Sequence, residues 1–179
     1  MKHELWYSVV VRDRQGKVVS RERHRARSFL KAWNQMVYLH MSGTNLTIKD
    51  ITGANFTATR NTLDFRMKPT PGIYCGEGDT PVTIEDYHLE SLAALDVLAM
   101  TVSEAAIADS HCYFLVSRSF LNTTGVTITV KEVGIRVYVG KTGTPTSTVC
   151  MVIRDVLVTP QAIPDGGGIT VDYTLEVVA

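Results

Sequence analysis

The chain has 179 residues, a formal net charge of zero at pH 7 and a hydrophobic fraction of 45%. That length can bury one sizeable core, and no apolar run approaches the roughly 20 residues of a membrane-spanning helix, so we expect no membrane insertion. The first residues lack the basic leader and cleavage site of a secretory signal, so we expect no secretion.

The three cysteines are Cys75, Cys112 and Cys150, an odd number spread far apart in the sequence. None belongs to a CxxC pair. This pattern predicts buried thiols in a reducing compartment rather than a framework of disulfides.

The first residues predict a β-hairpin. Residues 5–11 form an apolar run, and residues 18–25 return after a polar turn. Gly16 lies in that turn, where a positive φ would be needed.

A helix is predicted next, because apolar residues from Phe29 to Met41 recur at three- and four-residue spacing. Ser28 is the candidate N-cap, and Gly43 lies just past the predicted end. The aromatic stripe of this amphipathic helix is expected to face the core.

The stretch after the helix contains only short β-like pieces, at residues 46–48, 55–57 and 63–67. Residues 68–72 contain two prolines and a glycine, and they mark a candidate boundary. We therefore predict an N-terminal lobe over residues 1–68 and a C-terminal β-domain over residues 72–179. One continuous domain is the alternative.

The C-terminal part alternates strand-like segments with turn signals at short spacing. The predicted strands are residues 73–75, 96–102, 111–120, 126–139, 148–158 and 169–177. The apolar positions change parity at Lys131 and Glu132, which predicts a β-bulge. A turn is expected at residues 122–125, and residues 82–95 fit either an extended segment or a short helix.

Helix-length crossovers between these strands are missing, which disfavours a parallel sheet. We therefore predict a mainly β fold, an antiparallel β-sandwich of jelly-roll or immunoglobulin-like type, with one N-terminal amphipathic helix.

Charge is unevenly distributed along the chain. Residues 12–31 carry eight basic and two acidic residues, whereas residues 69–117 contain eight acidic residues and no lysine or arginine. Three interpretations stay open: solvated faces, a basic face that meets an acidic face within or between subunits, and nucleic-acid binding. The neutral net charge and the lack of interleaved aromatic residues disfavour the third.

Charged residues also interrupt two predicted strands, Arg118 in one and the pair Arg154 and Asp155 in another. In the simplest interpretation these side chains lean outward or are satisfied at a bulge. The alternative hypothesis is an inter-strand or inter-subunit bridge. The candidate assembly contacts are Arg21, Arg23, Arg25, Arg27, Glu85, Asp86, Glu90, Arg118, Arg154 and Asp155.

Signatures of catalysis and metal binding are missing from the sequence. It contains no GxSxG, no HExxH and no zinc-finger spacing. His111 and Cys112 would point to opposite faces of one strand, so they cannot form a two-ligand site by themselves. Glu85, Asp86 and Glu90 could act as acid and base only in a shared cleft. We predict a non-enzymatic protein without cofactor or metal.

Three stretches carry a resemblance to a known group of proteins. They are residues 76–90 (GEGDTPVTIEDYHLE), residues 117–135 (SRSFLNTTGVTITVKEVGI), and residues 152–157 (VIRDVL) with the PDGGG turn and last strand behind them. Together they resemble a turn-and-strand pattern of virion structural proteins of tailed bacteriophages. The N-terminal hairpin and helix resemble the front end of the same proteins.

This resemblance covers most of the chain and implies a β-sandwich subunit of a virion, made in the host cytoplasm. Such a subunit packs against copies of itself and against other capsid, neck or tail proteins, as a homo-oligomer within a larger assembly. No direct contact with nucleic acid or membrane is implied.

The alternative is a carbohydrate- or receptor-binding β-sandwich module, which needs exposed aromatic rings on one flat face. Trp6 and Trp33 fall in a predicted strand and in the predicted helix core, so we expect both to be structural. Tyr87 and Tyr138 are the residues whose mutation would test this alternative.

Overall fold

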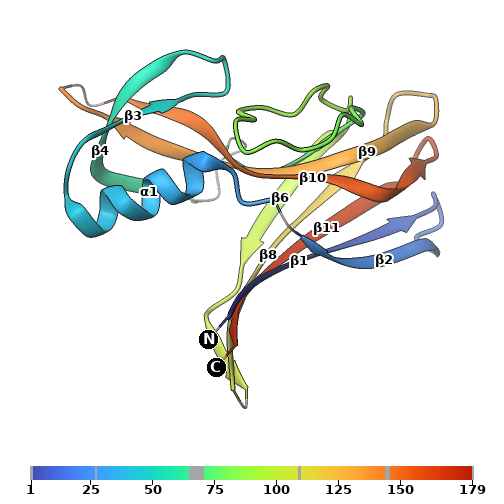
Figure 1. Cartoon of the computed structure of the whole chain (residues 1–179). Coiled ribbons are helices and arrows are strands. Elements are labelled where there is room, and N and C mark those ends of the chain that lie inside the picture. Colours follow the sequence, from blue (N-terminus) through green and yellow to red (C-terminus); the bar gives the residue numbers. More distant parts are fainter. Residues whose placement is uncertain (1, 27, 65–70, 109, 144–145, 179) are drawn as a thin grey trace.

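The computed structural model describes residues 2–26, 28–64, 71–108, 110–143 and 146–178. Within these ranges the chain forms one helix and eleven strands (Figure 1). The helix is α1 (Lys31–Ser42), and the strands are β1 (Lys2–Arg12), β2 (Val18–Ala26), β3 (Leu46–Lys49), β4 (Asn55–Asp64), β5 (Gly72–Gly76), β6 (Asp96–Val102), β7 (Ala106–Ala108), β8 (His111–Leu121), β9 (Ile128–Lys141), β10 (Ser147–Ile163) and β11 (Gly168–Val178).

These strands form two antiparallel sheets, which confirms the predicted mainly β fold. Sheet A has the order β2-β1-β11-β8-β6, with β7 also beside β8, and sheet B has the order β10-β9-β4-β3, with β5 also beside β9. Alternating residues from both sheets, such as Val9, Val171 and Val137, are at most 1% exposed and belong to one hydrophobic cluster. Burial of this shared apolar surface is what holds the two sheets together.

The predicted N-terminal hairpin is confirmed. β1 and β2 pair from Leu5 opposite Ala26 to Arg12 opposite Val18. Gly16 in the turn has a φ of 80°, a conformation that costs glycine little because it has no Cβ.

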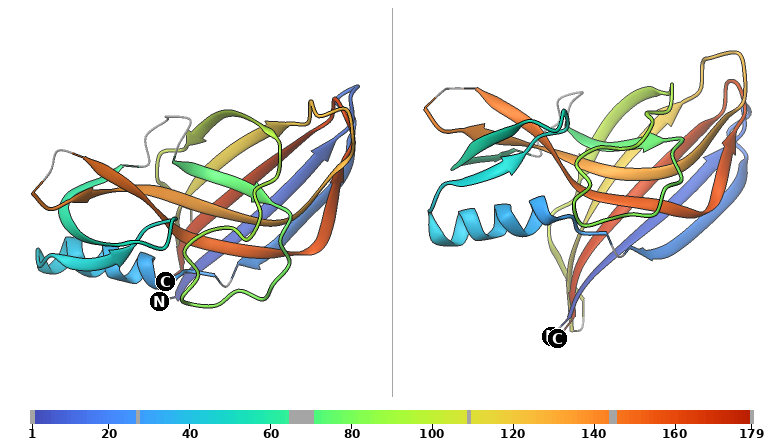
Figure 2. Two further views of the ribbon diagram at one scale, coloured as in Figure 1. Left: turned by 90° about the horizontal axis from the view of Figure 1, so that it is seen from above. Right: turned by 45° about the horizontal axis from the view of Figure 1, so that its top comes forward.

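The first and last strands pair along their whole length, from Lys2 opposite Val178 to Arg12 opposite Gly168. The two ends of the chain therefore lie side by side (Figure 2). β1 and β2 thus share sheet A with C-terminal strands, and β3 and β4 share sheet B with β9. This pairing favours the alternative prediction of one continuous domain; part of the predicted boundary, residues 65–70, lies outside the described residues.

The strands predicted at residues 111–120 and 126–139, on either side of the predicted turn, do not pair with each other. β8 belongs to sheet A and β9 to sheet B, so the turn at residues 122–125 carries the chain from one sheet to the other. The register between β9 and β10 does shift beside Glu132, as predicted. The extra residues lie in the partner strand, however, because residues 157–160 of β10 stand opposite Lys131 alone.

The helix α1 lies in the stretch where the sequence predicts one, but its predicted N-cap is wrong. Leu30 occupies the N-cap position and makes no side-chain hydrogen bond, whereas the hydroxyl of Ser28 donates to Asp155. Gly43 closes the helix in a left-handed conformation, and its N–H donates to the carbonyl of Leu39. Buried Met36 joins α1 to the core.

Candidate functional site

Arg154, in the middle of β10, is the centre of a buried ion network. Its side chain is 3% exposed, so it does not lean outward, and the register of β10 against β9 shifts just before it, between Met151 and Ile153, as the bulge form of that interpretation expects. The guanidinium donates from Nε to Glu132 at 2.7 Å and from Nη1 to Asp86 at 2.6 Å. Glu132 lies on the neighbouring strand β9 and has no exposed surface. Arg154 and Glu132 therefore form an ion pair between two strands of the same chain, which is one of the two bridges that the alternative hypothesis allowed.

The network also fixes the acidic segment between β5 and β6. Residues 77–95 form a loop, and the part predicted as an extended segment or a short helix, residues 82–95, contains no helix and one isolated β-bridge at Leu92. Arg154 reaches the carbonyl of Thr80 at 3.2 Å, and the second oxygen of Glu132 accepts from the backbone N–H groups of Gly78 and Ser91. Both ends of the loop are thereby tied to one buried carboxylate.

Two glycines allow this close approach. A Cβ added to Gly76 would lie 2.5 Å from the carbonyl of Ser91, and one added to Gly78 would lie 2.4 Å from the Cβ of Glu90. A side chain at either position would therefore force the loop away from β9.

The ionisation of the network suits a structural role. Burial raises the pKa of Asp86, but hydrogen bonds from Thr83 and Arg154 outweigh that effect, so the pKa lies below its ordinary value. Burial lowers the pKa of Arg154, and the hydrogen bonds to Glu132 and Asp86 more than reverse this. Hydrogen bonds from Thr80 lower the pKa of Glu90. Lowered pKa values keep Asp86 and Glu90 charged at neutral pH, which is unsuitable for a general acid.

Arg118, on β8, is likewise not directed outward, since it is 2% exposed. Its Nη1 donates to the carbonyl of Ile73 at 3.0 Å, and its guanidinium lies 5.7 Å from the ring centre of Tyr74. Arg136 of β9 lies over the same ring at 4.4 Å. Burial lowers the pKa of both arginines. This cluster joins the two sheets through cation–π contacts.

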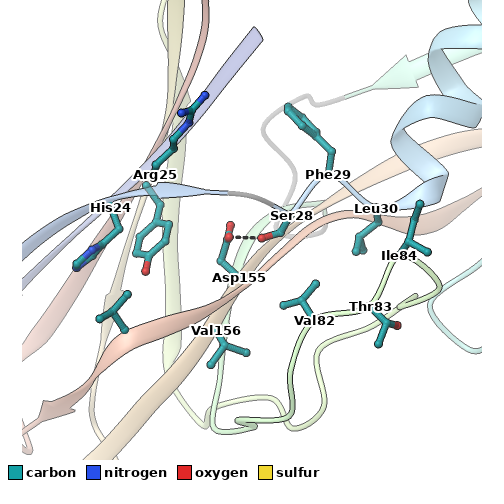
Figure 3. A pocket seen from close by; sticks show the side chains of 12 residues that line it. His24, Arg25, Ser28, Phe29, Leu30, Val82, Thr83, Ile84, Asp155 and Val156 are labelled. Carbon is teal, nitrogen blue, oxygen red and sulfur yellow. Dashed lines mark hydrogen bonds between the residues drawn. The ribbon is translucent and has the colours of Figure 1, made fainter. Parts of the chain in front are cut away.

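Asp155 follows Arg154 but points to the opposite side of β10 and lines a cavity of about 720 Å³. It accepts hydrogen bonds from Ser28 and, at 3.0 Å, from Tyr173. Burial, and then the charge of Asp155, raise the pKa of Tyr173 well above its ordinary value. In Figure 3 the pair of Ser28 and Asp155 stands apart from His24, whose Nε2 lies 3.1 Å from Glu22. The serine thus has a carboxylate partner but no histidine base in contact.

The basic strand β2 carries the remaining candidates. Arg21, Arg23 and Arg25 alternate along it and are exposed. Arg25 pairs with Glu4 at 2.9 Å, and Arg23 lies 5.0 Å from the ring centre of Trp6. Arg27 lies outside the described residues.

The basic run and the acidic loop meet at one exposed pair among the described residues, Lys31 with Glu85 at 3.0 Å. Of the predicted candidates, the structure brings three together: Arg154 pairs with Asp86, and its guanidinium lies 3.8 Å from the carboxylate of Glu90. Arg118 and Asp155 lie in separate clusters.

No known protein family, characterised protein or solved structure matches this chain. No helix in the described ranges is long and apolar enough to cross a membrane. Among the residues that the structure describes, no three His, Cys, Asp or Glu side chains are grouped closely enough to hold a metal ion.

The cysteines differ from the prediction at one position. Cys75 and Cys150 are buried, and burial raises the pKa of Cys150 to about 12, but Cys112 is exposed. Cys112 lies near the start of β8, opposite Ile107 of the short strand β7, and sequence alternation cannot reveal that this end of β8 is exposed.

Sequence reasoning also missed Glu132, Arg136 and Ser28 as members of these clusters. Glu132 and Arg136 interrupt an apolar β-branched run, as Arg154 does, and this was an available signal. Nothing in the sequence near Ser28 indicates its partner, which lies 127 positions away.

Proposed function

We propose that this protein is a non-enzymatic structural subunit of a tailed-bacteriophage virion, which packs against copies of itself and against other capsid, neck or tail proteins. The observation that carries this proposal is the acidic loop 77–95, held in one conformation on sheet B by the network of Arg154 and Glu132. The kind of protein proposed, a phage virion subunit, comes from the resemblance of residues 76–90, 117–135 and 152–157 to such subunits.

An assembly subunit needs fixed surfaces more than it needs a cleft. Loops that order only on contact lose conformational entropy at that moment, which weakens association. Here the buried charges already hold the loop, while Asp79, Glu85 and Glu90 remain exposed on it. The loop therefore offers a preorganised acidic surface to a neighbouring subunit.

We assign the fold within this proposal to an antiparallel β-sandwich of jelly-roll or immunoglobulin-like type. The shared core of sheets A and B supports this assignment. So do the connections from β8 to β9 and from β10 to β11, which pass from one sheet to the other.

The alternative of a glycan-binding module has less support. Tyr87 and Tyr138 are both half-buried, and the ammonium group of Lys49 lies 5.1 Å from the ring centre of Tyr87. A sugar stacking on that face of the ring would have to displace the lysine.

Solution mass measured by light scattering across a salt series tests the proposed self-association. We expect an oligomer or polymer at low salt that loosens as the Debye length falls from about 10 Å at 0.1 M to about 3 Å at 1 M. A monomer at every salt concentration would contradict self-association and would favour a binding module.

A further inference from the structure

Sheet A has two edges, and both lack a partner strand in the part of the chain that the structure describes. β2 pairs with β1 alone, whereas β6 and β7 pair with β8 alone (Figure 1). An edge strand presents unpaired N–H and C=O groups, which are a template for a strand of another chain.

The edge formed by β6 and β7 has neither of the residue types that most often block such pairing, although the register of β6 shifts between Val97 and Met100 and β7 has only three residues. Lysine and proline are the common blocking residues, and residues 96–108 contain neither. The edge instead exposes aliphatic side chains: Val97 at 39%, Leu98 at 48%, Val102 at 40% and Ile107 at 81%. Its charged residues are acidic, with Asp96 at the start of β6 and exposed Glu104 between the two strands.

The edge formed by β2 has the opposite charge and also exposes aliphatic groups. Val18 is 39% exposed and Val19 is 54% exposed. Arg21 and Arg23 point away from the core, and no described carboxylate lies within ion-pair distance of either. Glu22, on the inner side, is held by a hydrogen bond from Gln161 at 2.9 Å. The outward charge of β2 is therefore positive.

We propose that the β2 edge of one copy pairs with the β6–β7 edge of a second copy, so that sheet A continues from subunit to subunit. This inference rests on the proposed self-association and assigns it to the two edges of sheet A, which leaves the acidic loop 77–95 for contact with other virion proteins. Pairing of two β2 edges would bring Arg21 and Arg23 close to their own copies, and like charges disfavour that arrangement. The head-to-tail contact places positive charge beside negative charge and aliphatic groups beside aliphatic groups.

When two copies pair in this way, one copy keeps a free β2 edge and the other keeps a free β6–β7 edge. Such heterologous contacts form a ring when the rotation closes and a filament when it does not. Either product suits a subunit that is repeated around or along a particle.

A charge-swap experiment tests the contact. The first variant is Arg21→Glu with Arg23→Glu, which makes both edges acidic, and the second is Asp96→Lys with Glu104→Lys, which makes both edges basic. We expect each variant alone to have the mass of a single chain by light scattering, at protein concentrations where the wild type assembles. We expect an equimolar mixture to regain the wild-type mass, because every contact between the two variants then joins opposite charges.

The control is Lys49→Glu with Lys141→Glu, which changes the net charge by the same amount as the first edge variant but lies in sheet B, and it should keep the wild-type mass. Thermal unfolding of each variant by circular dichroism verifies that it is folded. Wild-type mass in both edge variants would overturn the contact while leaving self-assembly through another surface. Failure of the mixture to reassemble, or dissociation of the control, would also overturn it, and a monomeric wild type would overturn both proposals.

Discussion

Replacing Arg154 by methionine isolates the contribution of the buried network. The substitution keeps most of the side-chain volume but leaves the carboxylate of Glu132 buried without its cation. Removing one partner of a buried ion pair costs about 3–5 kcal/mol, and in a domain of this size each kcal/mol lowers the Tm by about 2–4 °C. We expect the free energy of unfolding to fall by about 3–5 kcal/mol and the Tm by roughly 6–20 °C.

Urea unfolding measures that free energy, and hydrogen exchange shows where the loss occurs. The backbone N–H groups of Gly78 and Ser91 donate hydrogen bonds to Glu132. In the variant they should exchange faster than in the wild type, whereas exchange in the distant hairpin β1–β2 should change less. Adding Glu132→Gln to Arg154→Met should restore part of the stability, because the uncompensated charge is removed and an acceptor oxygen remains.

Lys131→Met is the matched control, since Lys131 forms an exposed pair with Asp79 on the same loop and its loss should leave no measurable change. An Arg154→Met protein with wild-type stability and unchanged exchange in residues 77–95 would refute the claim that the network holds the loop.

Three further predictions concern separate parts of the fold. Gly134→Ala should lower the free energy of unfolding by about 1–3 kcal/mol in urea titrations, because the new Cβ would lie 2.5 Å from the carbonyl of Ile153; wild-type stability of this variant would contradict the prediction. Ser28→Ala should cost about 1–3 kcal/mol in the same assay, since buried Asp155 loses a donor, and wild-type stability would show the hydrogen bond to be unimportant. The folded pKa of Asp86 lies below its unfolded value, so its stabilisation is present at neutral pH and is lost as the pH falls below about 4 toward the folded pKa; Asp86→Asn should flatten that part of the stability curve, and an unchanged slope would rule the residue out as its source.

The alternation of apolar and polar residues was sufficient to predict several strands. The last strand β11 lies where that pattern places it, and the hairpin β1–β2 lies where an apolar run and its return after a polar turn place it. The positions of Gly16 in the hairpin turn and of Gly43 after the helix could also be predicted, since both require a positive φ.

Strand partners and buried charges were not predictable in the same way. Alternation within β8 and β9 is the same whether they pair together or lie in different sheets, so local sequence could not separate these arrangements. Arg154 resembles an outward-facing arginine in sequence, because the carboxylates and the loop that bury it come from residues 22 to 74 positions away. Of the candidate site, the sequence analysis therefore indicated Arg154, Asp86 and Glu90, missed Glu132, and could not indicate their contacts.

The pairing of β1 with β11 determines when the molecule can fold during its synthesis. The hairpin β1–β2 leaves the ribosome first, but the strand that fills its inner edge is made about 160 residues later, roughly 8–30 s at common translation rates. Throughout that interval the nascent hairpin has an unpaired inner edge, and sheet A cannot close until the last strand is released. Any contact that needs the complete sheet A is therefore delayed until β11 has been made.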